Sequence, residues 1–428
     1  MTSFDAGGPA AAPESVDQPM GNVRFLGQDR AYWHILLRGA VLLMVTLGIY
    51  RFWLTTDTRR FLWANTEIDG ESLEYSGTAL EILFGFLVAI ALLVPLYIVF
   101  FLSALEVGTA GPTTGLAFVL LMLISQYAAW LARGYRLTRT VFRGLYFHQT
   151  GSGLRYAVCV LFWWAMMLVT LGLAYPFAQA SLERFKLGHT HYGDLSGRFE
   201  GSGMRLFLRG FPLWFVVMAP TLIAISALLT ADWTQIGNIV QSGVTTGDIL
   251  FRIGTEVPEF YGAIGLFVVA FGFAVGATIL LFPAFQTIVM RWWVSGIRFA
   301  GVSVTSRLRM FDVYKAYLRF VGYLLLFALA MIVVALVTFG MIGFLFGPSE
   351  QSKFAEVFTI LAMVGLYVVS ALGLSTIYQA TAKLAVWRLT VQSSSLSDGS
   401  ALERVNVAGR QISPVGEGLA DALNTGGL

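Results

Sequence analysis

Two histidines that lie close together are the first side chains that could do chemistry. His189 and His191 stand two residues apart in the stretch HTHYGD, which ends at Asp194. In a strand or a turn such a pair can share a metal ion, but a zinc site needs three or four ligands that converge. A matching stretch earlier in the chain carries Asn65 and Glu67 at the corresponding positions. We therefore interpret the histidines as part of a solvated turn and expect no metal site.

Acidic and basic side chains also gather between residues 59 and 74. Glu67 and Asp69 follow closely on Arg59 and Arg60. Paired carboxylates can act in acid–base catalysis, but the neighbouring arginines favour an ion-pair network at the membrane surface. The chain has no GxSxG, HExxH or Walker A motif, and no GxGxxG that follows a strand. We expect no catalytic residue and no cofactor, so an enzyme is the least favoured class.

Arg38 is a further candidate, because it lies one turn into the first apolar run. A charge inside a membrane segment is costly, so it is a candidate functional group by default. Arg38 also follows Trp33 by only five residues, which lets its side chain reach back to the membrane surface. The sequence leaves both alternatives open.

The elements that position these residues must lie in a membrane. Of the 428 residues, 57% are hydrophobic and 12% are charged, whereas a soluble protein carries about 25% charged residues. Eight apolar runs approach the roughly 20 residues that a spanning helix needs, and they are too long for the strands of a membrane barrel. The runs cover about 33–50, 80–104, 115–132, 155–178, 206–230, 260–290, 317–347 and 354–385. We predict an all-α fold, a polytopic transmembrane helical bundle with six to eight membrane helices.

The apolar runs also indicate internal repeats. The stretch 45–70 returns as the stretch 169–194, with Gly48 and Gly172 placed 124 residues apart. Repeats are common in membrane transport folds and occur in other membrane proteins as well. The predicted regions are a disordered N-terminal tail (1–22), a first membrane repeat (23–146), a second membrane repeat (147–259), a C-terminal membrane region with a diverged third copy (260–390) and a disordered C-terminal tail (391–428).

Basic residues indicate the side of each loop, because Lys and Arg collect on the cytoplasmic side of a membrane. Segments 133–153 and 291–319 are rich in arginine, and we assign them to the cytoplasm. We assign 105–114, 231–259 and 346–353 to the outside.

This assignment leaves one crossing too many, at the fourth apolar run. We favour helical hairpins for the first and fourth runs, either re-entrant or lying on the membrane surface, broken at Gly48 and at Gly172 and Pro176. Six true spans and two cytoplasmic termini follow from this hypothesis. The alternative is eight true spans, with the two copies in opposite orientations.

Several phrases carry a resemblance to a known family. VRFLGQDRAYW, TLGIYRFW, RRFLWANTEIDG and LEYSGT resemble bacterial inner-membrane proteins of the domain of unknown function 898 family, the YjgN-like proteins. The match is clearest over 23–90 and fainter over 147–211 and 285–390, and the second copy loses most of the basic cluster in LAYPFAQASLERF. The resemblance implies a multi-pass protein of a bacterial cytoplasmic membrane, and it brings no known activity, ligand or catalytic residue.

Two function classes therefore stay open. One is a transporter or channel-like conduit, which the repeats and the Gly/Pro breaks favour. The other is a non-transport membrane scaffold or envelope-assembly partner, which the scarcity of charge inside the apolar runs favours. We expect the lipid bilayer to be a partner and nucleic acid not to be one, while the substrate and the oligomeric state stay open. The lone Cys159 excludes an internal disulfide.

Overall fold

The computed structural model describes most of the chain. The described residues are 21–106, 112–242, 245–299, 302–346, 353–397, 419 and 421–423. Most of both predicted tails lies outside these residues. The structure shortens both predicted tails, because a strand begins at Gly21 and a helix runs on to Gln392.

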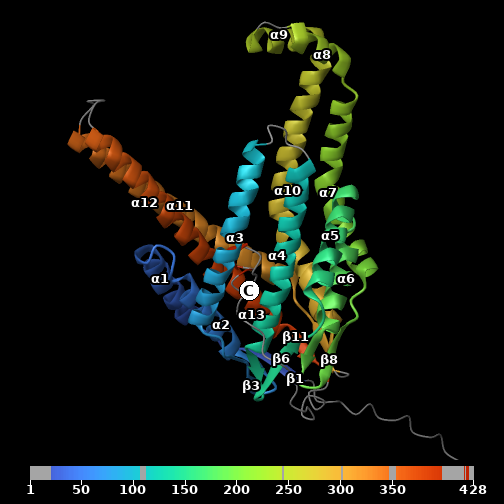
Figure 1. The fold of residues 1–428 in the computed structure, drawn as a ribbon, viewed down its shortest axis with the longest axis vertical. Helices are drawn as coiled ribbons and strands as arrows, with labels where there is room; N and C mark the ends of the chain where they lie inside the picture. The colour runs from blue at the N-terminus through green and yellow to red at the C-terminus, as the bar shows by residue number, and fades with distance from the viewer. Residues whose placement is uncertain are drawn as a thin grey trace, which may run out of the picture.

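Long apolar helices dominate the molecule, as predicted for a helical membrane protein (Figure 1). Among the described residues, five helical stretches are long and apolar enough to cross a membrane. They are Gly115–Thr138, Gly203–Leu229, Pro258–Gly296, Met310–Phe346 and Lys353–Gln392. Two shorter apolar helical segments, Ala79–Pro95 and Gly153–Val169, accompany them.

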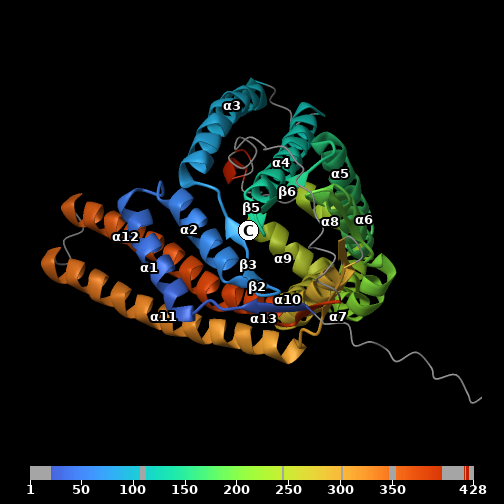
Figure 2. The same cartoon turned by 90° about the horizontal axis from the view of Figure 1, so that it is seen from below.

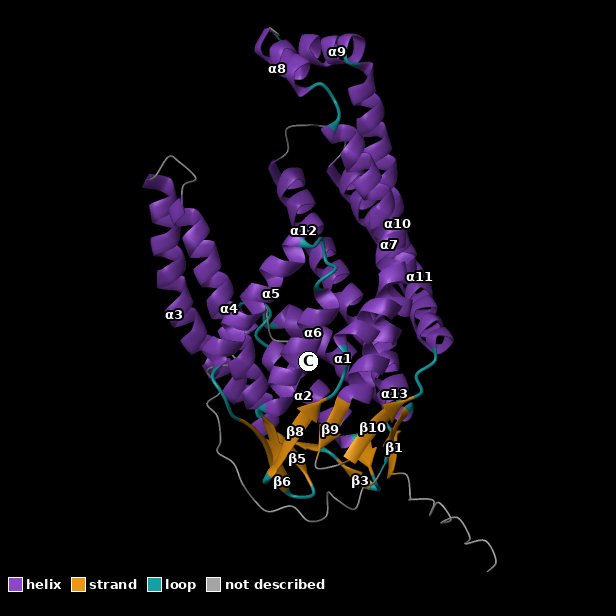
Figure 3. Ribbon diagram, turned by 90° about the vertical axis from the view of Figure 1, so that its right-hand side faces the viewer, coloured by secondary structure: helices purple, strands orange, loops and turns teal. Residues whose placement is uncertain are grey.

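The expectation of an all-α fold is wrong in one respect, because eleven short strands form a sheet at one end of the helices (Figure 3). The strand order is β3-β2-β1-β11-β10-β9-β8-β7-β6-β5-β4, and every pairing is antiparallel. Each strand is two to five residues long, too short for an alternating pattern to stand out beside the helical runs. Strands this short are stabilised in the sheet by pairing with strands that lie far away in the chain.

The sheet curves until the two ends of its strand order meet, and we call this circle of strands the ring. Strands β3 and β4 stand at the two ends of the strand order, but only Leu73 separates them in the chain. The Leu73 amide also donates to the Thr66 carbonyl at 3.0 Å, which continues the pairing. Strand β1 pairs with β11, so the first and the last strand meet in the ring.

The order strand–helix–helix–strand occurs five times along the chain. The first three units are β1 (Gly21–Phe25), α1 (Asp29–Val45), α2 (Arg51–Ala64), β2 (Thr66–Ile68); β3 (Glu71–Ser72) with β4 (Glu74–Tyr75), α3 (Ala79–Glu106), α4 (Pro112–Thr138), β5 (Thr140–Phe142); and β6 (Leu145–Gln149), α5 (Gly153–Val169), α6 (Tyr175–Gly188), β7 (Thr190–Tyr192). The fourth is β8 (Leu195–Phe199), α7 (Gly203–Leu229), α8 (Trp233–Ser242), α9 (Thr246–Glu256), α10 (Pro258–Gly296), β9 (Ile297–Phe299). The fifth is β10 (Val302–Ser306), α11 (Met310–Phe346), α12 (Lys353–Ile377), the π-helical turn η1 (Tyr378–Lys383), α13 (Leu384–Gln392), β11 (Ser394–Leu396).

A hydroxyl side chain fixes most of the junctions between a helix and the strand that follows it. In four units the first residue of the second strand donates its hydroxyl to the carbonyl four residues earlier. These hydroxyls belong to Thr66, Thr140, Thr190 and Ser394. Two of the turns that follow are tight, with left-handed backbone at Asp69–Gly70 and Arg143–Gly144, as two-residue hairpins require.

The first and third units hold short helix pairs that break where the sequence predicts. Between α1 and α2 the backbone turns left-handed at Leu47 and Gly48, and between α5 and α6 it does so at Leu171 and Gly172. Pro176 is not part of the break, because it lies in the first turn of α6. The other three units hold the long helices, which extend away from the ring, and α8 and α9 lie at the far end of the α7–α10 pair (Figure 1).

Candidate functional site

Arg60 has a structural role that recurs in the molecule. Its guanidinium donates to the Gly77 carbonyl at 3.0 Å, which ties the end of α2 to the start of α3. The same contact joins Arg184 to the Gly201 carbonyl at 3.1 Å and Arg388 to the Gly27 carbonyl at 2.8 Å. We call these three contacts the arginine clamps. Arg60 is therefore not part of the predicted ion-pair network with the neighbouring acids.

The acidic candidates also shape the ring. Asp69 has left-handed backbone, and its carboxylate accepts from the Asn22 amide at 3.0 Å. Glu67 lies in β2 opposite Arg24 of β1. Of the neighbouring acids, Glu71 forms an ion pair with Arg143 at 3.4 Å. These contacts hold strands of the ring together and do not bring two carboxylates to one reaction centre.

The two histidine candidates lie apart. The Nδ1 atom of His189 is 2.7 Å from the Phe185 carbonyl oxygen at the end of α6. His191 instead stacks on His148 across the β6–β7 pair, with ring centroids 4.9 Å apart. Within the part of the chain that the structure describes, no three His, Cys, Asp or Glu side chains are placed to hold a metal ion. Arg38 lies exposed on α1, separate from all of these residues.

The structure assembles a different polar site between the helices, which we call the vestibule. It is a cavity of about 470 Å³ bounded by α1, α2, α6, α10, α11, η1 and α13. These helices come from the first, third, fourth and fifth units, and Figure 2 shows them from the side of the ring. Its lining includes Tyr32, Gln179, Glu183, Gln286, Trp293, Tyr317, Tyr378, Lys383, Trp387 and Thr390. Aromatic rings and polar side chains thus line one space together.

The charges around the vestibule are unequal. Glu183 is well partnered, because Trp293 donates to Oε2 at 2.9 Å and Lys186 forms an ion pair with Oε1. Lys383 lines the cavity and lies within electrostatic range of Arg59. Among the described residues no carboxylate forms an ion pair with Lys383. The vestibule therefore carries a surplus of positive charge.

Arg59 itself is buried, with 3% of its surface exposed. Its guanidinium donates to the Tyr75 hydroxyl at 3.1 Å and lies over the ring of Tyr75. Of the predicted candidates, Arg59 is the one that lies within electrostatic range of a charged residue of the vestibule, Lys383. The other six serve the ring, cap a helix end or lie on the surface.

Two hydroxyls in the vestibule wall point to a bound group. Tyr32 is fully buried, and burial raises the pKa of its hydroxyl to about 12. Neither the Tyr32 hydroxyl nor the Thr390 hydroxyl has a hydrogen-bond partner among the described residues. A buried polar atom without a partner costs about 1–3 kcal/mol. A polar ligand or water in the vestibule would satisfy both.

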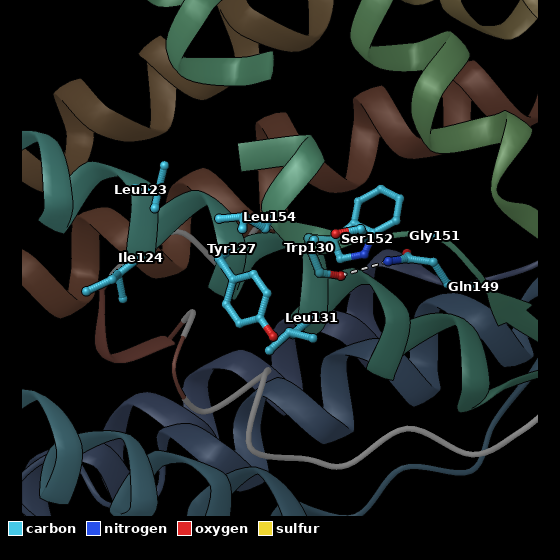
Figure 4. A pocket seen from close by; sticks show the side chains of 10 residues that line it. Leu123, Ile124, Tyr127, Trp130, Leu131, Gln149, Gly151, Ser152 and Leu154 are labelled. Atoms are coloured by element: carbon cyan, nitrogen blue, oxygen red, sulfur yellow. Dashed lines mark hydrogen bonds between the residues drawn. The ribbon is translucent and has the colours of Figure 1, made fainter. Parts of the chain in front are cut away.

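A second cavity lies at the seam between α4 and α5, with a volume of about 750 Å³ (Figure 4). Gln149 lines it and donates to the Trp130 carbonyl at 3.0 Å. The opposite end of the Gln149 amide accepts from Arg133 at 2.8 Å, and Arg133 also donates to the Thr190 hydroxyl at 2.7 Å. Arg133 lies within electrostatic range of Glu183. A chain of polar contacts therefore leads from this cavity toward the vestibule.

Sequence reasoning missed Glu183, Arg133 and Lys383. Arg133 looked like a loop arginine, but its helix continues to Thr138. A usable signal is the spacing to the strand, because Arg59, Arg133 and Glu183 each precede the first residue of their strand by seven positions. That common position turns these side chains toward the centre.

Comparisons with known proteins match the chain to a family of bacterial proteins. The family model described as "Bacterial protein of unknown function (DUF898)" matches residues 20–326. The inner membrane protein YjgN of Escherichia coli strain K12 is 29% identical over 111 residues, and that of Escherichia coli O157:H7 is 28% identical over 110 residues. Each alignment covers 26% of both chains, so the chain spans about a quarter of the length of these relatives. No solved structure matches the chain.

Proposed function

Since the chain belongs to the DUF898 family of bacterial proteins of unknown function, we propose a function for it from its own geometry. It is a multi-pass protein of the bacterial inner membrane that binds a small anionic molecule in the vestibule and passes it across the membrane. The printed names of the two relatives and the five long apolar helices support this location.

The observation that carries the proposal is the presence of charged side chains between the helices. Ionisable side chains within membrane segments are costly and tend to mark pathways for substrates or ions. Lys383 lines a cavity in which Glu183 already forms an ion pair with Lys186, and the buried Arg59 lies within electrostatic range of Lys383. An anion would balance the surplus charge, and its oxygens could accept from the Tyr32 and Thr390 hydroxyls.

We also propose the topology that the transport role requires. The three long helix pairs cross the membrane six times, and the α1–α2 and α5–α6 pairs enter and leave on the cytoplasmic side. Two observations support this arrangement. Residues 70 and 195 belong to the same ring, and the arginine-rich segments 133–153 and 291–319 both run through it. The ring and both termini then lie in the cytoplasm.

A second candidate function is a non-transport scaffold, and packing of the ring favours it. Phe142, Tyr192 and Leu396 are buried. The Tyr192 ring packs on Phe142 and Phe147, with centroids 6.0 and 4.8 Å away. Large side chains on this face of the ring narrow any route straight through it. An ion that passes the vestibule must therefore leave between the helices. A protein that conducts no ion would instead act as a scaffold or an assembly partner.

Thiol labelling in the vestibule separates the two functions. Gln179 lines the cavity, so Gln179→Cys in a Cys159→Ser background gives one reporter thiol. The probes are the anionic sulfonatoethyl and the cationic trimethylammonioethyl methanethiosulfonates, with rates normalised to a free thiol. We expect the anionic reagent to react about tenfold faster, because a charged cleft raises the local concentration of its counter-ion. Equal rates would overturn the anion site.

Two controls complete the experiment. Lys383→Gln should abolish the preference for the anionic reagent, whereas Lys315→Gln should not, because Lys315 is exposed on α11 and pairs with the Phe311 ring. Labelling from each face of right-side-out and inside-out vesicles tests passage. Access from both faces supports a conduit, and access from the ring side alone supports the scaffold.

A further inference from the structure

A groove between α1 and the α11–α12 pair is lined by apolar side chains, and we call it the lateral groove. It has a volume of about 510 Å³, and Figure 2 shows α1 beside the two long helices. Its lining includes Leu37, Val41 and Met44 of α1, Leu326 of α11 and Val369 of α12. Between 36% and 68% of the surface of each of these side chains is exposed. Among the described residues no charged side chain lines the groove, so it is open to the hydrocarbon of the membrane.

One end of the lateral groove lies at the level where we expect the membrane surface. The rings of Trp33 and Tyr323 meet there, with centroids 5.9 Å apart, and both residues line the groove. Arg319 is the last charged residue of α11, because residues 320–346 contain none. Trp and Tyr side chains collect at the headgroup level of a bilayer. We therefore place this end of the groove at the lipid headgroups and the rest of it in the hydrocarbon.

Cations stand beside this end of the groove on two helices. Arg30 lies three residues before the tryptophan of the aromatic contact and Arg319 lies four residues before the tyrosine, so each is one helical turn away from it. Both arginines are exposed, and among the described residues neither forms an ion pair. Asp29, the neighbouring acid on α1, forms an ion pair with Arg388 instead. The headgroup end thus carries positive charge that the protein itself leaves unpaired.

We propose that the lateral groove binds an anionic phospholipid from the leaflet next to the ring, with one acyl chain in the groove and the phosphate beside Arg30 and Arg319. Arginine binds phosphate oxygens through charge-assisted hydrogen bonds, and basic pockets between membrane helices bind anionic headgroups. A zwitterionic lipid has the same chains but carries a cation of its own, so it binds more weakly. The lateral groove and the vestibule share no lining residue among those described. The inference therefore goes beyond the proposed function and does not depend on it.

Quenching by nitroxide-labelled lipids tests the site. Met44→Cys in the Cys159→Ser background, labelled with bimane, places one fluorophore in the groove, eleven residues beyond Trp33 on α1. The protein is titrated in dodecyl maltoside micelles with phosphatidylglycerol or phosphatidylcholine, each with the nitroxide on its acyl chain. We expect phosphatidylglycerol to reach half-maximal quenching at about fivefold lower mole fraction, because basic residues near the membrane surface attract anionic headgroups. Equal mole fractions for the two lipids, or quenching by neither, would overturn the proposal.

Two double variants locate the headgroup. Arg30→Gln with Arg319→Gln should abolish the preference for phosphatidylglycerol. Arg205→Gln with Arg209→Gln is the matched control, because it removes the same charge from exposed positions on α7, and it should leave the preference unchanged. A preference that survives in the first variant, or that disappears equally in both, would show attraction to the overall charge of the protein and would contradict the site.

A second comparison locates the acyl chain. Ala40 lines the groove, so Ala40→Phe should fill part of it and weaken quenching by both lipids. Ala31 is exposed on the opposite side of α1, because nine residues correspond to about two and a half helical turns. Ala31→Phe should therefore leave quenching unchanged. If Ala40→Phe is quenched as strongly as Ala31→Phe, the acyl chain does not lie in the groove and the inference is wrong.

Discussion

Helices α2 and α6 have the same length and similar structures at their two ends, but their side chains present opposite charges to the centre of the molecule. Both follow a break with left-handed backbone, at Gly48 and Gly172. Both end in an arginine clamp onto a glycine carbonyl. Seven residues before the strand, however, α2 carries Arg59 and α6 carries Glu183.

This difference separates the residues that build the ring from those that define the site. Breaks, clamps and threonine junctions depend on backbone geometry, so the same residue types serve in several units. The position seven residues before the strand, which we call the central position, has no such constraint, because its neighbours differ between the units. Arg59 meets Tyr75 and Lys383, whereas Glu183 meets Trp293 and Lys186. The scaffold is therefore regular and the vestibule asymmetric.

Reversing the charge of Glu183 should have the largest effect. Glu183→Lys would place a cation against Lys186 and near Arg133, and removing one partner of a buried pair costs about 3–5 kcal/mol. Denaturant unfolding in detergent micelles measures the change. Glu183→Gln should lose less, because its amide oxygen still accepts from Trp293. A stable Glu183→Lys protein would mean that the central position does not depend on charge.

Replacing the glycine should have a similar effect on stability at either break, because no close neighbour makes an added side chain less favourable at one break than at the other. Gly48→Ala and Gly172→Ala should each cost about 1–2 kcal/mol, since both glycines have left-handed backbone. An added Cβ meets nothing within 4 Å at Gly48 and only Trp214 at 3.7 Å at Gly172. Gly188→Ala, in ordinary helical backbone, is the control and should be neutral or stabilising.

These same elements show how much of the fold can be predicted from the sequence. The breaks were predicted because glycine after a long apolar run is a local signal, and Gly48 and Gly172 stand at matched places. The membrane helices were predicted because their length and composition are local as well. The ring was not, since its strands are too short to show a pattern, and β1 finds its partner β11 at the other end of the chain.

The vestibule shows a second limit of sequence reasoning. Arg133 and Lys383 lie in segments whose local charge indicates a membrane surface, and only the convergence of several helices turns them inward. Glu183 gave no signal, because its partner Trp293 is 110 residues away. The candidates that were found from local clusters, Glu67, Asp69, His189 and His191, are the ones whose contacts are local to the ring and its helix ends.

The clamps should contribute equally in the two regions, with a smaller effect than the breaks. Arg60→Gln and Arg184→Gln should each lower the free energy of unfolding by about 1 kcal/mol, because a hydrogen bond from a charged donor is lost at a partly exposed site. Arg38→Gln is the matched control, since Arg38 is exposed on α1. A loss confined to one clamp would show that the two ends are not equivalent.

The smallest expected effect concerns a feature that the third unit has and the first lacks, the stacked pair His148 and His191. Burial lowers the pKa of His148 below its usual 6.5, and the neighbouring His191 lowers it further. The unfolded chain then binds a proton more readily than the folded protein, so stability falls as the pH drops below about 6.5. Unfolding measured between pH 7.5 and 5.5 should show a slope that His148→Phe reduces and that His34→Gln, at an exposed position on α1, leaves unchanged. The opposite slope would mean that the folded protein favours the charged pair, as an anion held between the rings would do.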